Sequence, residues 1–295
     1  LTPWCDKIAA QSKQRIMCQI FPSMQLGGTP PQLYDQVKDG VVDAIWTIPS
    51  YSAGRFPLIE VFELPFMMRN TEGASKAVWD YVQERAPNEF KDVKLLAFHT
   101  HGGGLLHMVN KPIKQAADLR GVKIRAPTRQ TTKMLAALGA APVGMPVPQV
   151  PDALAKGVID GALLPFEVVP AIKAQELTKF HSEPDASQPT LHTSVFIFAM
   201  NKAKYDALPA DLKQVIDANS GSALSAQMGR IFGEAEITNR VPAKSINVIA
   251  KDEIERWKAM TQSVADGWVQ EVSSKGADGK ALLARARELI AKYSK

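Results

Sequence analysis

Residues 31–43 read PQLYDQVKDGVVD and residues 148–160 read PQVPDALAKGVID, an ungapped internal repeat that is identical at six of thirteen positions. In both copies a glycine, Gly40 or Gly157, precedes a short apolar stretch, and a proline follows soon after the last Asp. Glycine suits the left-handed position just after a helix, so each copy predicts a short helix, a turn and a brief strand. The repeat indicates two similar α/β units, with chance similarity of two helix–glycine–strand segments as the alternative.

Two such units predict two lobes around a shared cleft, because open α/β sheets bind ligands at the carboxyl ends of their strands. Elsewhere, strands are predicted over 93–100, 121–125 and 192–200, and helices over 131–138, 211–236, 251–273 and 280–293. This order predicts an α/β class in which each lobe is a mixed sheet flanked by helices, with long C-terminal helices bridging the lobes. The expected first lobe comprises 1–104 plus about 196–235, and the second comprises 105–195 plus about 236–295.

The composition is that of a folded protein with scattered charge. Apolar residues make up 45% of the chain and charged residues 22%, and the formal net charge is +5. No basic stripe interleaved with aromatic residues is present, so we expect no nucleic-acid partner. The longest apolar runs, such as 195–200, are too short to span a bilayer. No signal peptide is visible, and we expect the sequence to begin after one.

The sequence offers little support for catalysis or for a metal. The run from His101 through three glycines to Gly104 resembles an oxyanion-hole motif of esterases, but the Gly-x-Ser-x-Gly elbow that this chemistry needs is absent. His99, His101 and His107 lack a further ligand at diagnostic spacing. We therefore predict no enzyme activity, no cofactor and no metal. The glycine run instead indicates a hinge or a closely approached backbone.

Cys5 and Cys18 are the only cysteines. Cys5 lies in a predicted helix over 3–11 and Cys18 in a predicted strand over 16–21. A helix folded back on this strand closes a disulfide loop of about 14 residues, worth roughly 3 kcal/mol. The alternative is a pair of separate buried thiols. A disulfide would place the protein in an oxidising compartment.

Arg125 ends the short strand over 121–125, just before Ala126-Pro127. A guanidinium matches a carboxylate through two parallel hydrogen bonds, so an arginine at a strand end is a candidate anchor for an organic acid. A surface arginine is the alternative.

Several motifs in order resemble the solute-binding proteins of TRAP (tripartite ATP-independent periplasmic) transporters, DctP type. They lie at residues 21–28, 56–66, 121–127, 138–146, 157–165 and 200–202. The resemblance implies a periplasmic binding protein fold, a periplasmic location, partnership with membrane permease subunits, and a carboxylate-gripping role for Arg125. It also implies departures: Gly102–Gly104 replaces a segment that often holds a second arginine, 160–166 lacks an expected Asn, and the first strand is expected to be missing from the start.

These departures favour a ligand with one carboxylate on an apolar body. The pocket is predicted to contain Arg125, Trp46, Met145, Leu164, Phe166 and Phe196, with His101, His107 and Ser194 as weaker candidates for a 2-oxo or hydroxyl partner. Aromatic or apolar 2-oxo and 2-hydroxy acids, such as benzoylformate or mandelate, are favoured over dicarboxylates and sugar acids, whose extra polar groups would be left unpaired. The alternative is that several of these apolar residues belong to the hydrophobic core. Another acid, an ABC importer or an acid-processing enzyme remain the rival functions, and we expect a monomer.

Overall fold

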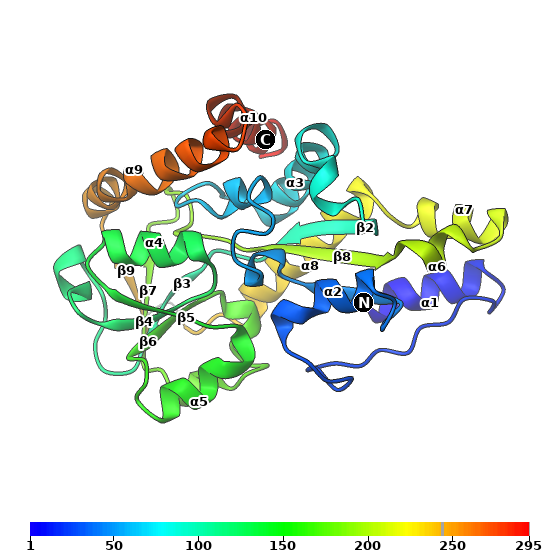
Figure 1. Ribbon diagram of the computed structural model, residues 1–295. Coiled ribbons are helices and arrows are strands. Elements are labelled where there is room, and N and C mark those ends of the chain that lie inside the picture. Colours follow the sequence, from blue (N-terminus) through cyan, green and yellow to red (C-terminus); the bar gives the residue numbers. More distant parts are fainter. Residues whose placement is uncertain (243–244, 295) are drawn as a thin grey trace.

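The structure is a computed structural model that describes residues 1–242 and 245–294. The chain folds into two α/β lobes, each built on its own sheet (Figure 1). The strands are β1 Ala44–Thr47, β2 Val93–Thr100, β3 Leu105–Met108, β4 Lys123–Ala126, β5 Ala141–Gly144, β6 Gly161–Leu164, β7 Phe180–Pro184, β8 Val195–Asn201 and β9 Ile246–Ile249. The helices are α1 Thr2–Gln11, α2 Leu33–Lys38, α3 Thr71–Arg85, α4 Arg129–Ala137, α5 Val150–Ala155, α6 Lys202–Asp206, α7 Ala210–Ala218, α8 Ser222–Thr238, α9 Lys251–Ser274 and α10 Gly279–Tyr293.

The first lobe contains a three-stranded antiparallel sheet in the order β1-β8-β2. Alternate residues of β8 face opposite sides, as the two-residue period of a strand requires. Val195 and Ile197 pack with α3 residues such as Val78, while Phe198 packs on the other side with Ile8 of α1. Both faces of β8 are covered, which explains its unbroken apolar sequence.

The second lobe contains a six-stranded mixed sheet in the order β5-β4-β6-β3-β7-β9. On one face Ile124 and Leu163 pack with Met134 of α4. On the other face Leu164 packs with Leu154 of α5. The chain passes between the lobes at β2–β3, at β7–β8 and between α8 and β9.

Helix α9 bridges the two lobes. Near its start, Ile254 and Trp257 belong to the core of the second lobe. Further along, Trp268 lies in the core of the first lobe and donates to the Pro57 carbonyl at 2.8 Å. Helix α10 packs against α3 along the top of Figure 1. This contact places α10 with the first lobe, whereas the sequence assigned 236–295 to the second.

The internal repeat is a structural repeat. Each copy runs from a 3-10 turn into a short helix (α2 or α5), a glycine with positive φ, a four-residue strand (β1 or β6) and a second 3-10 turn. The φ angles of Gly40 and Gly157 are 78° and 66°. Corresponding amides also bond alike: Val41 donates to Gln36 and Val158 to Ala153, both at 2.9 Å. The two strand ends thus present equivalent turns at the lobe interface.

The expected strand over 16–21 is wrong, although the disulfide is confirmed. Cys5 and Cys18 are bonded, with their Cα atoms 5.6 Å apart. Lys13 and Gln14 have positive φ and turn the chain after α1, and residues 17–21 are exposed. Within the described ranges this segment pairs with no strand, and β-propensity is expressed only where a neighbouring strand supplies pairing and packing. The helix expected over 211–236 is likewise two helices, α7 and α8, separated at Gly221, whose φ is 89°.

Candidate functional site

Arg125 is buried at the carboxyl end of β4, with 2% of its surface exposed. Its Nε donates to the Met145 carbonyl at 3.0 Å and its Nη1 to the Leu163 carbonyl at 2.9 Å. Among residues 1–242 and 245–294, its Nη2 has no hydrogen-bond partner. In the part of the chain that the structure describes, no carboxylate forms an ion pair with Arg125. The two carbonyl contacts therefore fix the guanidinium while one donor edge stays available.

The charge of Arg125 acts on two buried histidines. Burial, with a smaller effect from the nearby guanidinium of Arg125, lowers the pKa of His101 to about 4. Burial also holds the pKa of His192 well below its usual range, with His101 and Arg125 adding to the effect. The pKa of Arg125 is itself lowered by burial, an effect that Tyr51 of the first lobe opposes. Both imidazoles are neutral, so Arg125 is the positive centre of this site.

Two of the predicted polar partners are already engaged. His101 accepts a bond from the Ser194 amide at Nε2, 2.9 Å away, and its Nδ1 contacts the Gly102 carbonyl. His107 contacts the Leu164 carbonyl at 3.2 Å and His181 at 2.9 Å. Their rings hold the chain segments in place rather than offering free nitrogens. The Ser194 hydroxyl, by contrast, is buried and has no hydrogen-bond partner within the described part of the chain.

An aromatic cluster adjoins this site in the first lobe. It consists of Trp46 from β1, His99 from β2, Phe196 from β8 and Phe232 from α8. The rings of Trp46 and Phe196 stack at 4.8 Å, and the Trp46 indole donates to His99 at 2.7 Å. Phe196 also meets the His101 ring at 6.2 Å, which links the cluster to the histidines near Arg125. The two predicted aromatic residues of the first lobe thus lie together.

The predicted apolar residues of the second lobe have a different setting. Leu164 and Phe166 are fully buried in the core beside α5, and the Phe166 ring contacts His107 at 5.0 Å. Met145 reaches Arg125 through its backbone carbonyl, while its side chain packs against the same core. Leu164 and Phe166 thus pack in this core, and their place in the ligand pocket stays a prediction.

The glycine run after His101 is required by three close approaches. A Cβ on Gly102 would lie 2.7 Å from the Glu236 side chain, and one on Gly103 would lie 2.7 Å from Thr190. A Cβ on Gly104 would overlap the ring of His192. The run is thus a closely approached backbone, one of the two expectations from sequence. Across residues 1–242 and 245–294, no group of three potential metal-binding side chains occurs.

Sequence reasoning missed His192, Tyr51 and the carboxyl group of Glu63. Glu63 lies at the lobe interface, where its Oε1 accepts a hydrogen bond from the Val195 amide at 3.2 Å. Burial, followed by the nearby charge of Glu60, raises the pKa of Glu63 to about 8. No local sequence signal marks any of these three residues, because their environments are made by distant segments.

The raised pKa of Glu63 predicts a pH-dependent stability. The native carboxyl binds its proton more tightly than the unfolded one, so its contribution is complete below pH 4.5 and is lost as the pH rises through about 8. Glu63→Gln should therefore flatten the fall in unfolding free energy between about pH 5 and pH 9, measured by urea denaturation. Substitution of the exposed Glu234 by glutamine should leave the slope unchanged. A slope in Glu63→Gln equal to that of the wild type would contradict the assignment.

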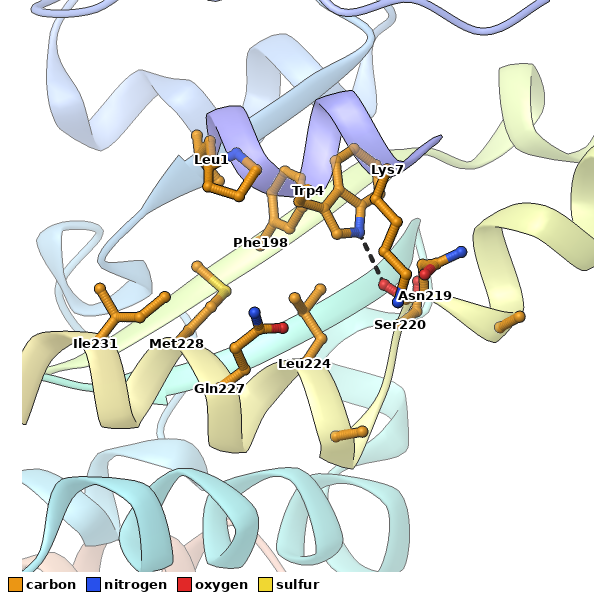
Figure 2. A pocket seen from close by; sticks show the side chains of 13 residues that line it. Leu1, Trp4, Lys7, Phe198, Asn219, Ser220, Leu224, Gln227, Met228 and Ile231 are labelled. Atoms are coloured by element: carbon orange, nitrogen blue, oxygen red, sulfur yellow. Dashed lines mark hydrogen bonds between the residues drawn. The ribbon is translucent and has the colours of Figure 1, made fainter. Parts of the chain in front are cut away.

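A separate hollow of about 180 Å³ lies between α1 and α8 on the first lobe (Figure 2). Its walls are mostly apolar and include Trp4, Phe198 and Met228. The Trp4 indole already donates to the Asn219 carbonyl at 2.8 Å, and the one cationic side chain in the lining, Lys7, is exposed. The hollow lacks a buried positive charge, so Arg125 marks the better candidate for an anion site.

Comparisons with known proteins agree on one family. The sequence profile of "Bacterial extracellular solute-binding protein, family 7" (DctP) matches residues 1–271. A TRAP solute-binding protein from Rhodoferax ferrireducens, in complex with copurified benzoate, is 52% identical, with a TM-score of 0.94 over 99% of this chain and 92% of that one. A marine metagenome TRAP solute-binding protein specific for aromatic acid ligands, in complex with 3-hydroxybenzoate, is 46% identical, with a TM-score of 0.97 over 100% and 93% of the two chains.

A more distant structure extends the comparison. A TRAP periplasmic solute-binding protein from Bordetella bronchiseptica, with bound (R)- and (S)-mandelate, is 26% identical, with a TM-score of 0.89 over 99% of this chain and 93% of that one. Among the described helices, none is long and apolar enough to cross a membrane.

Proposed function

Because the chain belongs to the bacterial extracellular solute-binding proteins of family 7 (DctP), we propose that its ligand is an aromatic monocarboxylate. The chain is a periplasmic solute-binding receptor of the TRAP type, and such receptors work with membrane permease subunits. This membership favours a TRAP permease over an ABC importer as the partner. It also favours a receptor that returns its ligand unchanged over an acid-processing enzyme.

The single observation that carries the proposal is the buried guanidinium of Arg125 with an unpaired Nη2. A buried charge without a counter-ion is costly, and an anionic ligand removes that cost. A carboxylate can take the available edge of Arg125 while the carbonyls of Met145 and Leu163 hold the other donors. Among the described residues, Arg125 is the only lysine or arginine that is buried, so one carboxylate matches the charge.

The aromatic part of the proposal is supported by the neighbouring ring cluster. The rings of Trp46 and Phe196 are stacked. Phe196 also contacts His101, whose pKa is lowered in part by the charge of Arg125. Aromatic bodies gain both apolar burial and ring contacts in such surroundings. The similar proteins bind benzoate, 3-hydroxybenzoate and mandelate, which are aromatic monocarboxylates. Benzoylformate and mandelate remain our favoured 2-oxo and 2-hydroxy representatives.

Capture is coupled to lobe closure in this proposal. Arg125 belongs to the second lobe and the aromatic cluster to the first, so a ligand that touches both favours the closed arrangement. The crossings at Gly102–Gly104 and between β7 and β8 are the expected hinges. The ligand's greater affinity for the closed form supplies the free energy of closure.

Calorimetry on protein refolded without ligand tests the proposal. We expect benzoate, mandelate and benzoylformate to bind, and benzamide, which has the ring of benzoate without its charge, to bind at least about a hundredfold more weakly. Malate tests a dicarboxylate and glucuronate a sugar acid. Tighter binding of malate or glucuronate than of every aromatic acid would overturn the proposed ligand class. Native mass spectrometry of the protein before refolding identifies any acid that copurifies.

A further inference from the structure

His192 stands apart from the other four histidines of the chain. It is 1% exposed, and neither of its ring nitrogens has a hydrogen-bond partner in the part of the chain that the structure describes. His99 bonds to Trp46, His101 to the Ser194 amide, and His107 and His181 to each other. A buried imidazole with two unused nitrogens is an unpaired polar group, which costs free energy unless something else bonds to it.

The backbone is shaped to seat this ring. Gly104 donates its amide to the His192 carbonyl at 3.0 Å and forms a β-bridge with it. At this distance any side chain on residue 104 would occupy the space of the His192 imidazole. Glycine is therefore required at this point by the ring itself.

The ring faces the same region as the proposed ligand anchor. Its pKa responds to both Arg125 and His101, and its ring centroid lies 5.2 Å from that of His101. His101 in turn contacts Phe196 of the aromatic cluster. His192 thus lies beside both the charged and the aromatic parts of the proposed site.

Ser194 supplies a second unused polar group nearby. Residues two apart on an extended chain project from the same side, and His192, Ser194 and Phe196 follow this spacing into β8. The Ser194 hydroxyl is fully buried and has no hydrogen-bond partner among the residues that the structure describes. A neutral imidazole has one donor and one acceptor, and a serine hydroxyl can act as both. This set matches a ligand hydroxyl, which also donates and accepts, better than a second carboxylate, which only accepts.

We propose that His192, assisted by Ser194, is a specificity-determining residue that hydrogen-bonds a hydroxyl group on the ligand. Within the proposed ligand class, hydroxylated acids such as mandelate are then preferred over acids without a hydroxyl, such as benzoate and benzoylformate. This inference rests on the proposed function, since it needs a carboxylate held by Arg125. An acid without the hydroxyl leaves His192 unpaired in the closed site and binds more weakly.

Two matched ligand pairs test the inference by calorimetry: mandelate with phenylacetate, and 3-hydroxybenzoate with benzoate. In at least one pair, the wild-type protein should bind the hydroxylated acid about tenfold or more tightly. Mandelate carries its hydroxyl beside the carboxylate, and 3-hydroxybenzoate carries it on the ring. The pair that shows the difference in affinity therefore tells which hydroxyl position is recognised. The absence of a preference in both pairs overturns the inference.

His192→Phe keeps an aromatic ring and removes both nitrogens. It should reduce the preference to less than about threefold while the hydroxyl-free acid binds within about threefold of its wild-type affinity. His192→Asn, which retains a donor and an acceptor, should keep part of the preference. Persistence of the full preference in His192→Phe overturns the inference. If His192→Phe fails to fold, Ser194→Ala provides the test. This variant should lower the preference for the hydroxylated acid by at least about threefold, and an unchanged preference would contradict the inference.

The two proposals fail in different ways. If none of the four acids binds to the wild-type protein, the proposed function is wrong. If they bind but the hydroxyl has no effect, only the role of His192 is wrong, and the assignment of Arg125 stands.

Discussion

Arg125→Ala is expected to weaken binding of benzoate and related acids by about a hundredfold to several thousandfold. Removing one partner of a buried ion pair costs about 3–5 kcal/mol, and each 1.4 kcal/mol is a factor of about ten in affinity. Arg125 is 2% exposed and is the only buried lysine or arginine in the part of the chain that the structure describes, so no other buried cation can replace it. Isothermal titration with benzoate, mandelate and benzoylformate measures the loss.

Two further variants make the result specific. Arg125→Lys keeps the charge but loses the planar donor fork, so its affinity should fall between those of the wild type and Arg125→Ala. Arg120→Ala removes an exposed arginine from the same lobe and should leave the affinity unchanged. Binding to Arg125→Ala as tight as to the wild type would show that the carboxylate is held elsewhere. The position of Arg125 would then be structural.

Local sequence rules were sufficient for the repeated units. The positions of Gly40 and Gly157 follow from the need for positive φ after a helix, and the strands that follow are set by short apolar runs. Arg125 was singled out because it lies near the end of a strand, where α/β sheets bind ligands, and its role as ligand anchor stays a prediction. The Cys5–Cys18 pair was also foreseen, since only two cysteines were available.

Other features depend on contacts between distant segments. Both faces of β6 are covered, so its apolar sequence does not distinguish core from cleft, and the pocket role of Leu164 and Phe166 stays a prediction. His192 shows no local motif, and its significance appears only once the partners of the other histidines are known. The alternating segment at 16–21 met the sequence criterion for a strand but lacks a pairing neighbour among the described residues.

The two lobes are also joined by an ion cluster of Arg129, Glu60 and Glu271. Arg129 begins α4 in the second lobe, and its guanidinium contacts both oxygens of Glu60 from the first lobe at 2.7 Å. Its Nη1 and Nη2 donate hydrogen bonds to the Glu271 carboxylate of α9 at 2.9 and 3.0 Å. These contacts raise the pKa of Arg129 despite burial, and they lower the pKa of Glu271 to about 2. Glu60 is only 1% exposed, and Gln130 donates to it at 2.7 Å.

Arg129→Met is therefore expected to lower the free energy of unfolding by about 3–5 kcal/mol, because it leaves the buried Glu60 carboxylate without a cation. The amide of Gln130 remains as a partner but carries no charge. Adding Glu60→Gln to this variant removes the unpaired carboxylate charge and should restore about 1–3 kcal/mol of the free energy of unfolding. Urea denaturation of the wild type, both single variants and the double variant completes the cycle.

Arg230→Met provides the matched control. Arg230 pairs with Glu234 one turn along α8 at 3.8 Å, and both side chains are more than half exposed, at 56% and 63%. Exposed pairs of this kind contribute at most about 0.5 kcal/mol, so this variant should differ little from the wild type. If Arg129→Met loses no more than Arg230→Met, or if Glu60→Gln brings no recovery, burial of Glu60 is not the cause. Loss in the single variant with recovery in the double would establish that Arg129 offsets the cost of a carboxylate placed between the lobes.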